Sequence, residues 1–251
     1  MKIVVIGGTG LLGATLVARL AADGHAAVAA SRRTGVDALT GRGLAAALEG
    51  AAAVVDVSNA SRFDAAGVME HFTVATRMLL EHAAAARVGH VVALSVVGVD
   101  AVEDSPYLRA KWAQEALITA SGLPHSIVRS TQFFEFLPRL ADHALVRSEV
   151  RLPPVPVRPI AGEDVARTIA SVAVGRPVDG VIELAGPEVF RLDEIVGRVL
   201  RARQDARRVV ADPRAAYFGA RLTGRELLSG DAARIGSTRF DTWLRHSVEA
   251  P

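Results

Sequence analysis

The chain has 251 residues, half of them hydrophobic, and its 29 basic and 27 acidic residues give a formal net charge of +2. This length allows one large α/β domain, or a core with a smaller lobe, around a sizeable apolar interior. The absence of cysteine excludes disulfides, thiolate metal sites and a cysteine nucleophile, and it suits a cytoplasmic protein.

Neither a membrane span nor a metal site is expected. The apolar run in MKIVVIGG is too short for a secretory signal or a transmembrane helix and is typical of a buried strand. The seven histidines form no His-x-x-x-His pair of the kind that binds metals. The densest basic cluster, RARQDARR at 201–208, has no interleaved aromatic residue, so we interpret it as a solvated helix end and expect no nucleic-acid partner.

Short β-type runs alternate with longer helical patterns up to about residue 130. Strands are expected at 2–6, 25–31, 53–57, 90–95 and 126–129, and helices at about 10–22, 63–86 and 106–121. The segment 34–50 is ambiguous and predicts a short strand or loop near Val36, followed by a short helix. The alternation predicts an α/β protein with a Rossmann doubly wound parallel sheet and helices on both faces.

The sequence changes character after residue 147. VRLPPVPVRPI carries four prolines, which favour an edge strand or an extended segment over a central strand. The stretches GEDVARTIASVAV, GVIELAG and RLDEIVGRVLRA then predict a helix, a strand and another helix. We therefore expect a Rossmann core at 1–147 and a smaller C-terminal substrate-binding lobe at 148–251, packed on the core as a single structural unit.

Three glycines with the spacing GxxGxxG follow the first expected strand. Gly7, Gly10 and Gly13 lie between this strand and a helix, where glycines allow a tight turn and a close approach of the backbone to a pyrophosphate. The helix N-terminus then offers free N–H groups and a positive dipole end. The context predicts a dinucleotide site, with a tight structural turn as the alternative.

The end of the second strand indicates which dinucleotide is bound. An NAD site would offer an acidic residue here, whereas this chain has Ser31, Arg32 and Arg33, whose hydroxyl and guanidinium groups suit a 2′-phosphate. We therefore expect NADP(H) in preference to NAD(H). Two alternatives stay open: the arginines are ordinary exposed residues, or Asp37 lies near the adenine or the ribose.

A second polar segment follows the strand expected at 53–57. Ligands of open α/β sheets bind at the carboxyl edge of the strands. We therefore expect Val57, Ser58 and Asn59 to line the cofactor; the alternative is an ordinary Asn and Ser turn.

Lys111 is one of only two lysines in a chain with 27 arginines, and Tyr107 lies four residues before it. On a helix the two residues are neighbours, and an ammonium lowers the pKa of a nearby phenol, which then exchanges protons with a substrate oxygen. Ser95 ends a strand twelve residues before Tyr107 and is expected to polarise the substrate carbonyl. The alternatives are an exposed Lys111 paired with Glu115 and a serine that satisfies local backbone.

These motifs resemble a known family. IGGTGLLG, SRR, a serine twelve residues before YLRAK, and RSTQFFEFL together look like the NmrA-like branch of the atypical short-chain dehydrogenases/reductases. The resemblance implies NADP(H) and hydride transfer, with Ser95, Tyr107 and Lys111 as polariser, acid/base and cofactor anchor. It also implies cofactor contacts by Thr9, Leu11 and Leu12 and a nicotinamide flanked by Thr131, Gln132 and Phe133. The Asn-Asn-Ala-Gly stretch of other branches is absent, so a fourth catalytic residue is not assigned.

The expected function is an NADPH-dependent oxidoreductase that reduces a small apolar or aromatic carbonyl, enone or quinone compound. Phe133, Phe134 and Phe136 either wall the pocket for this small-molecule substrate or form the core face of a helix. One alternative is an NADP(H)-binding redox sensor without turnover, and another is a non-redox epimerase or dehydratase. A homodimer formed through long helices is also compatible with the sequence.

Overall fold

The computed structural model describes residues 1–102, 104–222 and 224–249. The chain forms two compact units whose segments interleave along the sequence. Unit 1 contains Met1–Ser95, Arg109–Arg129 and Ala166–Ile182, and unit 2 contains Val96–Leu108, Ser130–Val165 and Glu183–Pro251. The chain thus returns to unit 1 after residue 165, and the boundary expected at 147 falls inside unit 2.

A seven-stranded sheet confirms the predicted α/β class. Its order is β12-β9-β5-β4-β3-β1-β2, and the pairs β2–β1, β1–β3, β3–β4 and β9–β12 are parallel. The strands are β1 (Lys2–Ile6), β2 (Ala26–Ala30), β3 (Ala53–Asp56), β4 (His90–Val96), β5 (His125–Ser130), β9 (Gly180–Ala185) and β12 (Arg234–Ile235). From β1 the chain first adds β2 on one side and then β3 on the other, so the order reverses between β1 and β3.

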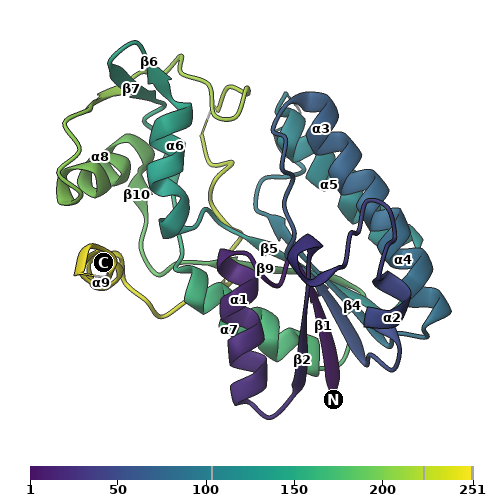
Figure 1. Cartoon of the computed structure of the whole chain (residues 1–251). Coiled ribbons are helices and arrows are strands. Elements are labelled where there is room, and N and C mark those ends of the chain that lie inside the picture. Colours follow the sequence, from purple (N-terminus) through teal and green to yellow (C-terminus); the bar gives the residue numbers. More distant parts are fainter. Residues whose placement is uncertain (103, 223, 250–251) are drawn as a thin grey trace. The chain divides into compact units, whose positions relative to one another are not determined.

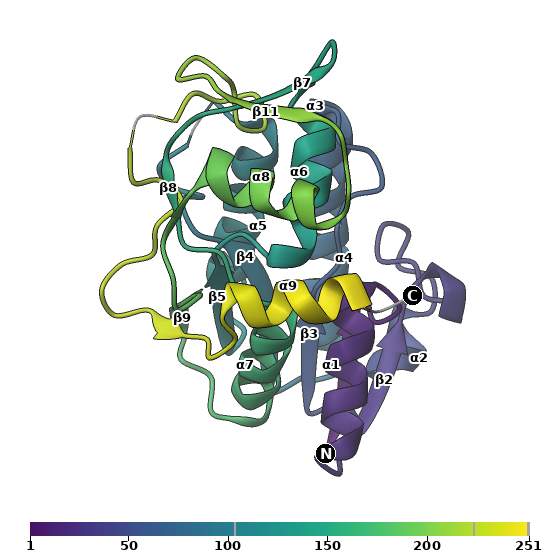
Figure 2. The ribbon, with the colours of Figure 1, turned by 90° about the vertical axis from the view of Figure 1, so that its left-hand side faces the viewer.

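Helices cover both faces of this sheet (Figure 1 and Figure 2). One face carries α1 (Leu11–Ala22) and α7 (Gly162–Val174), and the other carries α3 (Ala65–Glu70), α4 (Thr76–Ala85) and α5 (Pro106–Ala120). The helix expected at 63–86 is interrupted by a π-helical turn, η2 (His71–Ala75). The ambiguous segment 34–50 follows a 3-10 turn, η1 (Arg32–Thr34); it forms a loop at Val36 and then the short helix α2 (Leu44–Leu48), as one of its two interpretations predicted.

Unit 2 is built from short elements around the proline-rich segment. Strands β6 (Leu145–Val146), β7 (Glu149–Leu152) and β11 (Arg208–Ala211) form one small sheet, and β8 (Pro156–Val157) pairs with β10 (Phe190–Arg191) in another. Proline lacks the N–H that a longer ladder needs, so β7 ends just before Pro153 and β8, which begins at Pro156, stays short. The 3-10 turn η3 (Phe134–Phe136) and the helices α6 (Leu137–His143), α8 (Leu192–Ala202) and α9 (Phe240–Glu249) complete the unit.

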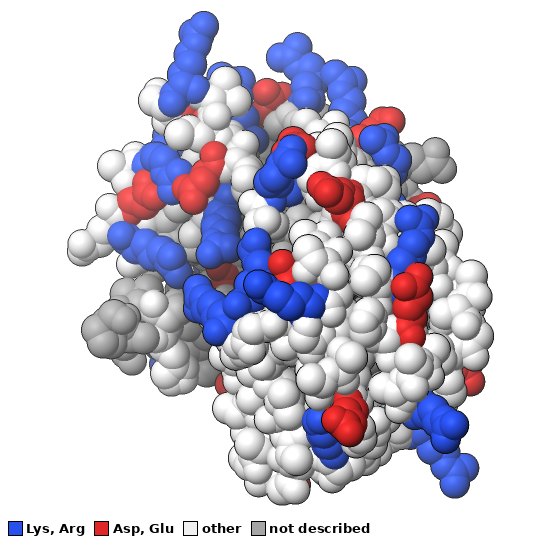
Figure 3. All heavy atoms as spheres, turned by 45° about the vertical axis from the view of Figure 1, so that its right-hand side comes forward, with Lys and Arg blue, Asp and Glu red and all other residues white. Residues whose placement is uncertain are grey.

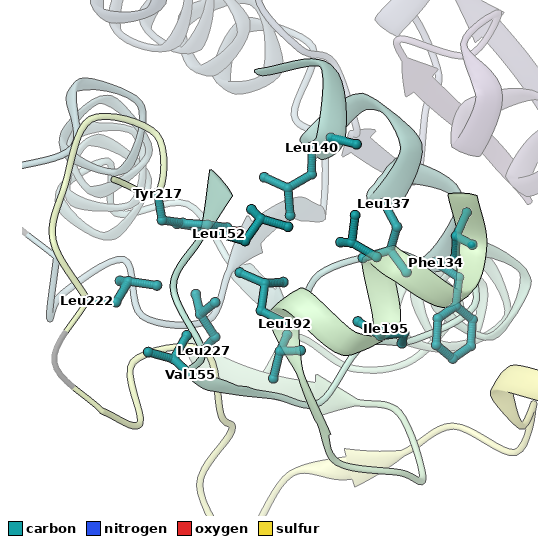
Figure 4. Close-up of a cluster of buried hydrophobic side chains, with 14 of the residues drawn as sticks. Phe134, Leu137, Leu140, Leu152, Val155, Leu192, Ile195, Tyr217, Leu222 and Leu227 are labelled. Carbon is teal, nitrogen blue, oxygen red and sulfur yellow. The ribbon is translucent and has the colours of Figure 1, made fainter. Parts of the chain in front are cut away.

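The core of unit 2 brings distant segments together, as Figure 4 shows. Leucines from η3–α6, β7 and α8 point toward one another, and the segment 217–227 closes this cluster with an aromatic and two aliphatic side chains. The labelled residues are Phe134, Leu137, Leu140, Leu152, Val155, Leu192, Ile195, Tyr217, Leu222 and Leu227. Burial of these side chains, each worth about 1.5–3 kcal/mol, holds the long loops of this unit against its helices.

Charged side chains of both signs are interspersed on the face shown in Figure 3. Much of the arginine is paired locally; Arg207, for example, lies 2.6 Å from Asp205 and 2.7 Å from Asp142. Arg207 belongs to the cluster at 201–208, so part of that cluster is neutralised by its own neighbours. Within the described residues, no helix is long and apolar enough to cross a membrane.

The turn between β1 and α1 needs glycine for steric reasons. Gly7 has φ +81°, a left-handed conformation that side chains disfavour. A Cβ added at Gly8 would lie 2.7 Å from the Ala29 Cα, and one added at Gly13 would lie 2.1 Å from the Gly7 carbonyl oxygen. The first turn of α1 therefore packs directly on the preceding loop, which fixes the start of this helix.

We expect Gly13→Ala to lower the free energy of unfolding by about 3 kcal/mol, because its methyl group forces the Gly7 carbonyl out of place. Denaturant unfolding measures this change. Gly10→Ala is the matched control in the same turn, since its Cβ would lie 3.3 Å from the Gly7 oxygen with φ in the ordinary range, and it should cost about 1 kcal/mol. Equal losses for the two variants would contradict this packing account.

Candidate active site

The glycine turn lies where the strand order of the sheet reverses, at the carboxyl ends of β1 and β3. A Cβ on Gly7 would come within 2.9 Å of the Ser58 Cα, so the backbones of the two strand ends touch. Thr9 donates a hydrogen bond from its Oγ1 to the Ser31 Oγ at 2.9 Å, which joins this turn to the end of β2. Open α/β sheets bind their ligands at such a reversal point.

The N-terminus of α1 is open. Gly10 is its N-cap residue and supplies no side-chain hydrogen bond to the first turn. Leu11 is exposed, Leu12 is half-buried and Gly13 is buried, so the first turn lies at the surface of unit 1. Free N–H groups and the positive end of the helix dipole fit a phosphate at this position.

Two arginines are exposed at the end of β2. Ser31 and Thr34 form a capping box that holds Arg32 and Arg33 in the turn η1. Within the described residues neither guanidinium takes part in an ion pair. Asp37 accepts a hydrogen bond from the Leu39 N–H at 3.0 Å and thus stabilises its own turn.

The residues that follow β3 differ in their exposure. Val57 is half-buried and its N–H bonds the carbonyl of Ile6 at 3.0 Å. The Ser58 Oγ lies 3.3 Å from the His71 Nε2, which belongs to the π-helical turn. Asn59 is exposed and accepts a hydrogen bond from the Ala60 N–H at 2.9 Å. Ser58 therefore lies between the glycine turn and an imidazole that the sequence did not indicate.

Lys111 is buried, in contrast to the alternative of an exposed lysine paired with Glu115. Its Nζ donates to the Leu94 carbonyl oxygen at 2.6 Å and to the Gln114 Oε1, and it lies 4.4 Å from the centre of the Phe72 ring. Burial lowers the pKa of Lys111 to about 8, while the charges of Asp56 and Glu115 oppose this decrease. Glu115 itself pairs with Arg129 at 2.7 Å.

Ser95 follows Leu94 on β4. Because the Lys111 ammonium donates to the Leu94 carbonyl, it contacts the strand that carries Ser95. The Ser95 side chain is 5% exposed, and its Oγ has no hydrogen-bond partner among the described residues. A buried hydroxyl without a partner costs free energy, and a bound ligand would satisfy it. This observation favours a binding role for Ser95 over local backbone satisfaction.

Three residues of this region were missed from the sequence. Gln114 accepts a hydrogen bond from Lys111 and donates one to Asp56, and the π-helical turn presents His71 beside Ser58. Burial lowers the pKa of His71, whereas the charge of Asp56 opposes this effect. The available signals were weak: an acid at the end of an apolar strand for Asp56, and no pattern for the π-helical turn.

Tyr107 belongs to unit 2, where it lies on the first turn of α5 and is half-buried. Its ring centre is 6.2 Å from that of Phe218, which also lies near Phe136, His143 and Tyr217 at 6.0, 5.8 and 4.8 Å. Phe218 has φ +48°, a strained conformation for a bulky residue. These five rings define the aromatic cluster of unit 2, which has Phe218 at its centre and includes the predicted catalytic phenol of Tyr107.

Three residues assigned by resemblance lie together in unit 2. Thr131 is buried and its Oγ1 has no partner among the described residues. Gln132 accepts a hydrogen bond from the Tyr217 hydroxyl at 2.5 Å, and Phe133 forms a parallel bridge with Ile160. Burial, together with Tyr107, raises the pKa of Tyr217 well above its usual value.

The three phenylalanines of RSTQFFEFL differ in their burial. Phe134 is fully buried and packs 5.4 Å from Phe240 and 5.2 Å from Trp243, so it belongs to the core of unit 2 (Figure 4). Phe133 and Phe136 are half-buried and keep part of their surface accessible. The pocket role therefore stays a prediction for these two residues only.

Solved structures of the same fold cover nearly the whole chain. MoeE5 in complex with UDP-glucose and NAD is 21% identical with a TM-score of 0.76, over 99% of this chain and 98% of its own. UDP-glucose 4-epimerase from Thermotoga maritima is 15% identical with a TM-score of 0.77, again over 99% and 98%. DesIV, a dTDP-glucose 4,6-dehydratase from Streptomyces venezuelae with NAD and TYD bound, is 22% identical with a TM-score of 0.72, over 99% and 96%. At these identities the likeness establishes the fold.

Protein-family models and curated proteins give no match to this chain. The structural comparison corrects the functional expectation. The expected NADPH-dependent carbonyl, enone or quinone reductase is wrong, because two of these three structures are described as a UDP-glucose 4-epimerase and a dTDP-glucose 4,6-dehydratase, and the third is MoeE5 with UDP-glucose and NAD. This finding favours the epimerase or dehydratase alternative, and none of the three structures is described as an NmrA-like protein.

Tyr217 is one of only two tyrosines in the chain, and its phenol should ionise late in an alkaline titration. Because burial raises the pKa of Tyr217, an alkaline titration followed by ultraviolet absorbance should show one phenol that ionises well above the usual value of about 10. In Tyr217→Phe this late phase should disappear and leave the titration of Tyr107 alone. A late phase that persists in the folded variant would contradict the burial of Tyr217.

Proposed function

We propose that this protein is a nicotinamide-dependent epimerase or dehydratase that acts on a nucleotide-linked sugar. The observation that carries the proposal is the match of almost the whole chain to three enzymes described with such activities or substrates. When bound, the nicotinamide would supply a reversible hydride acceptor, so that the substrate is changed without net oxidation. No observation favours a sensor without turnover.

The residues of unit 1 fit a dinucleotide in two respects. The open N-terminus of α1 supplies N–H donors and a positive dipole end for a pyrophosphate. The buried Ser95 hydroxyl has no partner among the described residues, and the Lys111 ammonium lies beside the same strand. We propose that α1 holds the pyrophosphate and that Lys111 anchors the nicotinamide ribose.

Tyr107 would act on the substrate as the acid/base. In an epimerase, a phenolate at Tyr107 would take the proton from the sugar hydroxyl that is oxidised, and the phenol would return it when the carbonyl is reduced again; in a dehydratase, the carbonyl would remain and the hydride would return to another carbon of the sugar. The buried hydroxyl of Ser95, in unit 1, would donate a hydrogen bond to a ligand bound on that unit. The proton balance closes within the site, which suits a reaction with no net redox change.

We also propose that unit 2 receives the nucleotide part of the substrate. The aromatic cluster of unit 2 offers ring faces and edges close to Tyr107, and the half-buried Phe136 belongs to it. Flat bases stack favourably on aromatic side chains, with about 1–3 kcal/mol per base. A nucleotide-linked sugar would thus be held by its base while its sugar reaches the phenol.

Turnover of a sugar-nucleotide panel tests the proposed reaction. UDP- and dTDP-linked hexoses incubated with the protein and a small amount of NAD or NADP should give an epimer or a dehydrated product, as followed by chromatography and NMR. Because general acid–base catalysis is lost, Tyr107→Phe should lower the rate at least about 100-fold while the dinucleotide still binds. Conversion by the variant at the parent rate would exclude Tyr107 as the acid/base, and no conversion of any member would contradict the substrate class.

We propose further that the dinucleotide is NADP, for which exposed Arg32 and Arg33 offer two guanidinium groups at the end of β2. Each bond to a charged phosphate is worth about 1.5–3 kcal/mol, so the Arg32→Ala, Arg33→Ala double variant should bind NADP more than about 100-fold more weakly while NAD binding changes little. Isothermal titration calorimetry measures both affinities. Equal losses for NADP and NAD would contradict the 2′-phosphate assignment.

A further inference from the structure

The ammonium of Lys111 is buried without a carboxylate in direct contact. Lys111 is 4% exposed, and its ammonium contacts the Leu94 carbonyl, the Gln114 amide oxygen and the face of the Phe72 ring. Lysine is almost never fully buried unless it is paired, because an unpaired buried charge loses its hydration. The protonation state of Lys111 therefore depends on the group that supplies negative charge closest to its ammonium.

Gln114 links that ammonium to a carboxylate. Its side chain is 2% exposed, its Oε1 accepts from the Lys111 Nζ, and its Nε2 donates to the Asp56 Oδ2 at 2.9 Å. An ammonium can only donate and a carboxylate can only accept, so a single orientation of the amide satisfies both neighbours. The amide dipole then points its negative end at Lys111.

Asp56 is fixed at the other end of this link. It is 6% exposed at the last position of β3, and its Oδ1 accepts from the Ser58 N–H at 2.9 Å, which leaves Oδ2 for Gln114. Within the described part of the chain Asp56 forms no ion pair, whereas Glu115 is engaged by Arg129. All of these residues belong to unit 1.

We propose that Gln114 is a positioning residue that couples the Asp56 carboxylate to the Lys111 ammonium, so that Lys111 stays charged and correctly aimed in a buried site. The part of this proposal that concerns a bound ribose depends on the proposed function, whereas the coupling itself does not. Two of the three ammonium donors go to Leu94 and Gln114, so the charged, oriented ammonium keeps one donor for a ribose hydroxyl.

The charges around Lys111 agree with this role. Burial lowers the pKa of Lys111 to about 8, and the opposing charges are those of Asp56 on β3 and Glu115 on α5. His71, from the π-helical turn, is a further titratable neighbour, and the charge of Lys111 adds to burial in lowering the pKa of this imidazole. At neutral pH Lys111 is thus mostly protonated. Loss of the Asp56 charge would bring the pKa of Lys111 closer to neutral pH.

The composition of the chain allows a direct test. Lys2 and Lys111 are the only lysines, so protein labelled with 13C at the lysine ε carbon gives two NMR signals, and Lys2→Arg leaves that of Lys111 alone. A pH titration of this signal measures the pKa of Lys111 without any assay of activity. Circular dichroism of each variant checks that it remains folded.

Removal of either partner should lower the pKa of Lys111. Gln114→Met keeps the shape but loses both hydrogen bonds, and Asp56→Asn keeps the size but loses the charge. In each variant we expect the neutral fraction at pH 7 to rise about fivefold. Both substitutions break the same Lys111–Gln114–Asp56 connection. The pKa of Lys111 in the double variant should therefore differ little from that in either single variant. Thr119→Val, at an exposed position of the same helix, is the control and should leave the pKa unchanged.

Gln114→Glu is the opposite test, because it places a carboxylate against the ammonium and should raise the pKa of Lys111 above that of the parent. A pKa of Lys111 that is unchanged in folded Gln114→Met and Asp56→Asn would overturn the coupling, since a purely structural role would alter stability alone. Binding of NAD and NADP, measured in the same samples, separates the two proposals. If the parent binds neither dinucleotide, the proposed function fails while the measured coupling stands.

Discussion

Close backbone contact at the reversal point of the sheet is the constraint on which the rest of the site depends. Gly7 can approach the backbone of Ser58 only because it lacks a Cβ, and Gly13 packs on the carbonyl of Gly7 for the same reason. These contacts align the open end of α1 with the ends of β1 and β3. The same approach brings Asp56, at the end of β3, to the edge where Lys111 is buried.

The buried ammonium is the second property that organises unit 1. Burial removes the Lys111 ammonium from water, which costs free energy and lowers its pKa to about 8. A buried lysine is therefore expected here only if its positive charge has a role. Gln114 and Asp56 offset this cost through hydrogen bonds instead of a direct ion pair. An indirect partner leaves the ammonium free of a competing carboxylate, which would otherwise reduce its interaction with a ligand.

The sequence predicts those parts of the fold that arise from local patterns. The strands at 2–6 and 53–57 and the glycine turn are visible as apolar runs and glycine spacing, and the rarity of lysine singles out Lys111. The link between Asp56 and Gln114 joins residues 58 positions apart, so no local pattern indicates it. The π-helical turn within 63–86 does not disturb the apolar periodicity, and the return of the chain to unit 1 after residue 165 depends on tertiary packing.

A crystal structure of the protein with NAD or NADP tests the central claim, that the carboxyl edge of β1, β3 and β4 binds a dinucleotide. The account predicts the pyrophosphate at the N-terminus of α1 and a ribose hydroxyl within hydrogen-bonding distance of the Lys111 Nζ. A dinucleotide bound elsewhere, with Lys111 still confined to Leu94, Gln114 and Phe72, would contradict it.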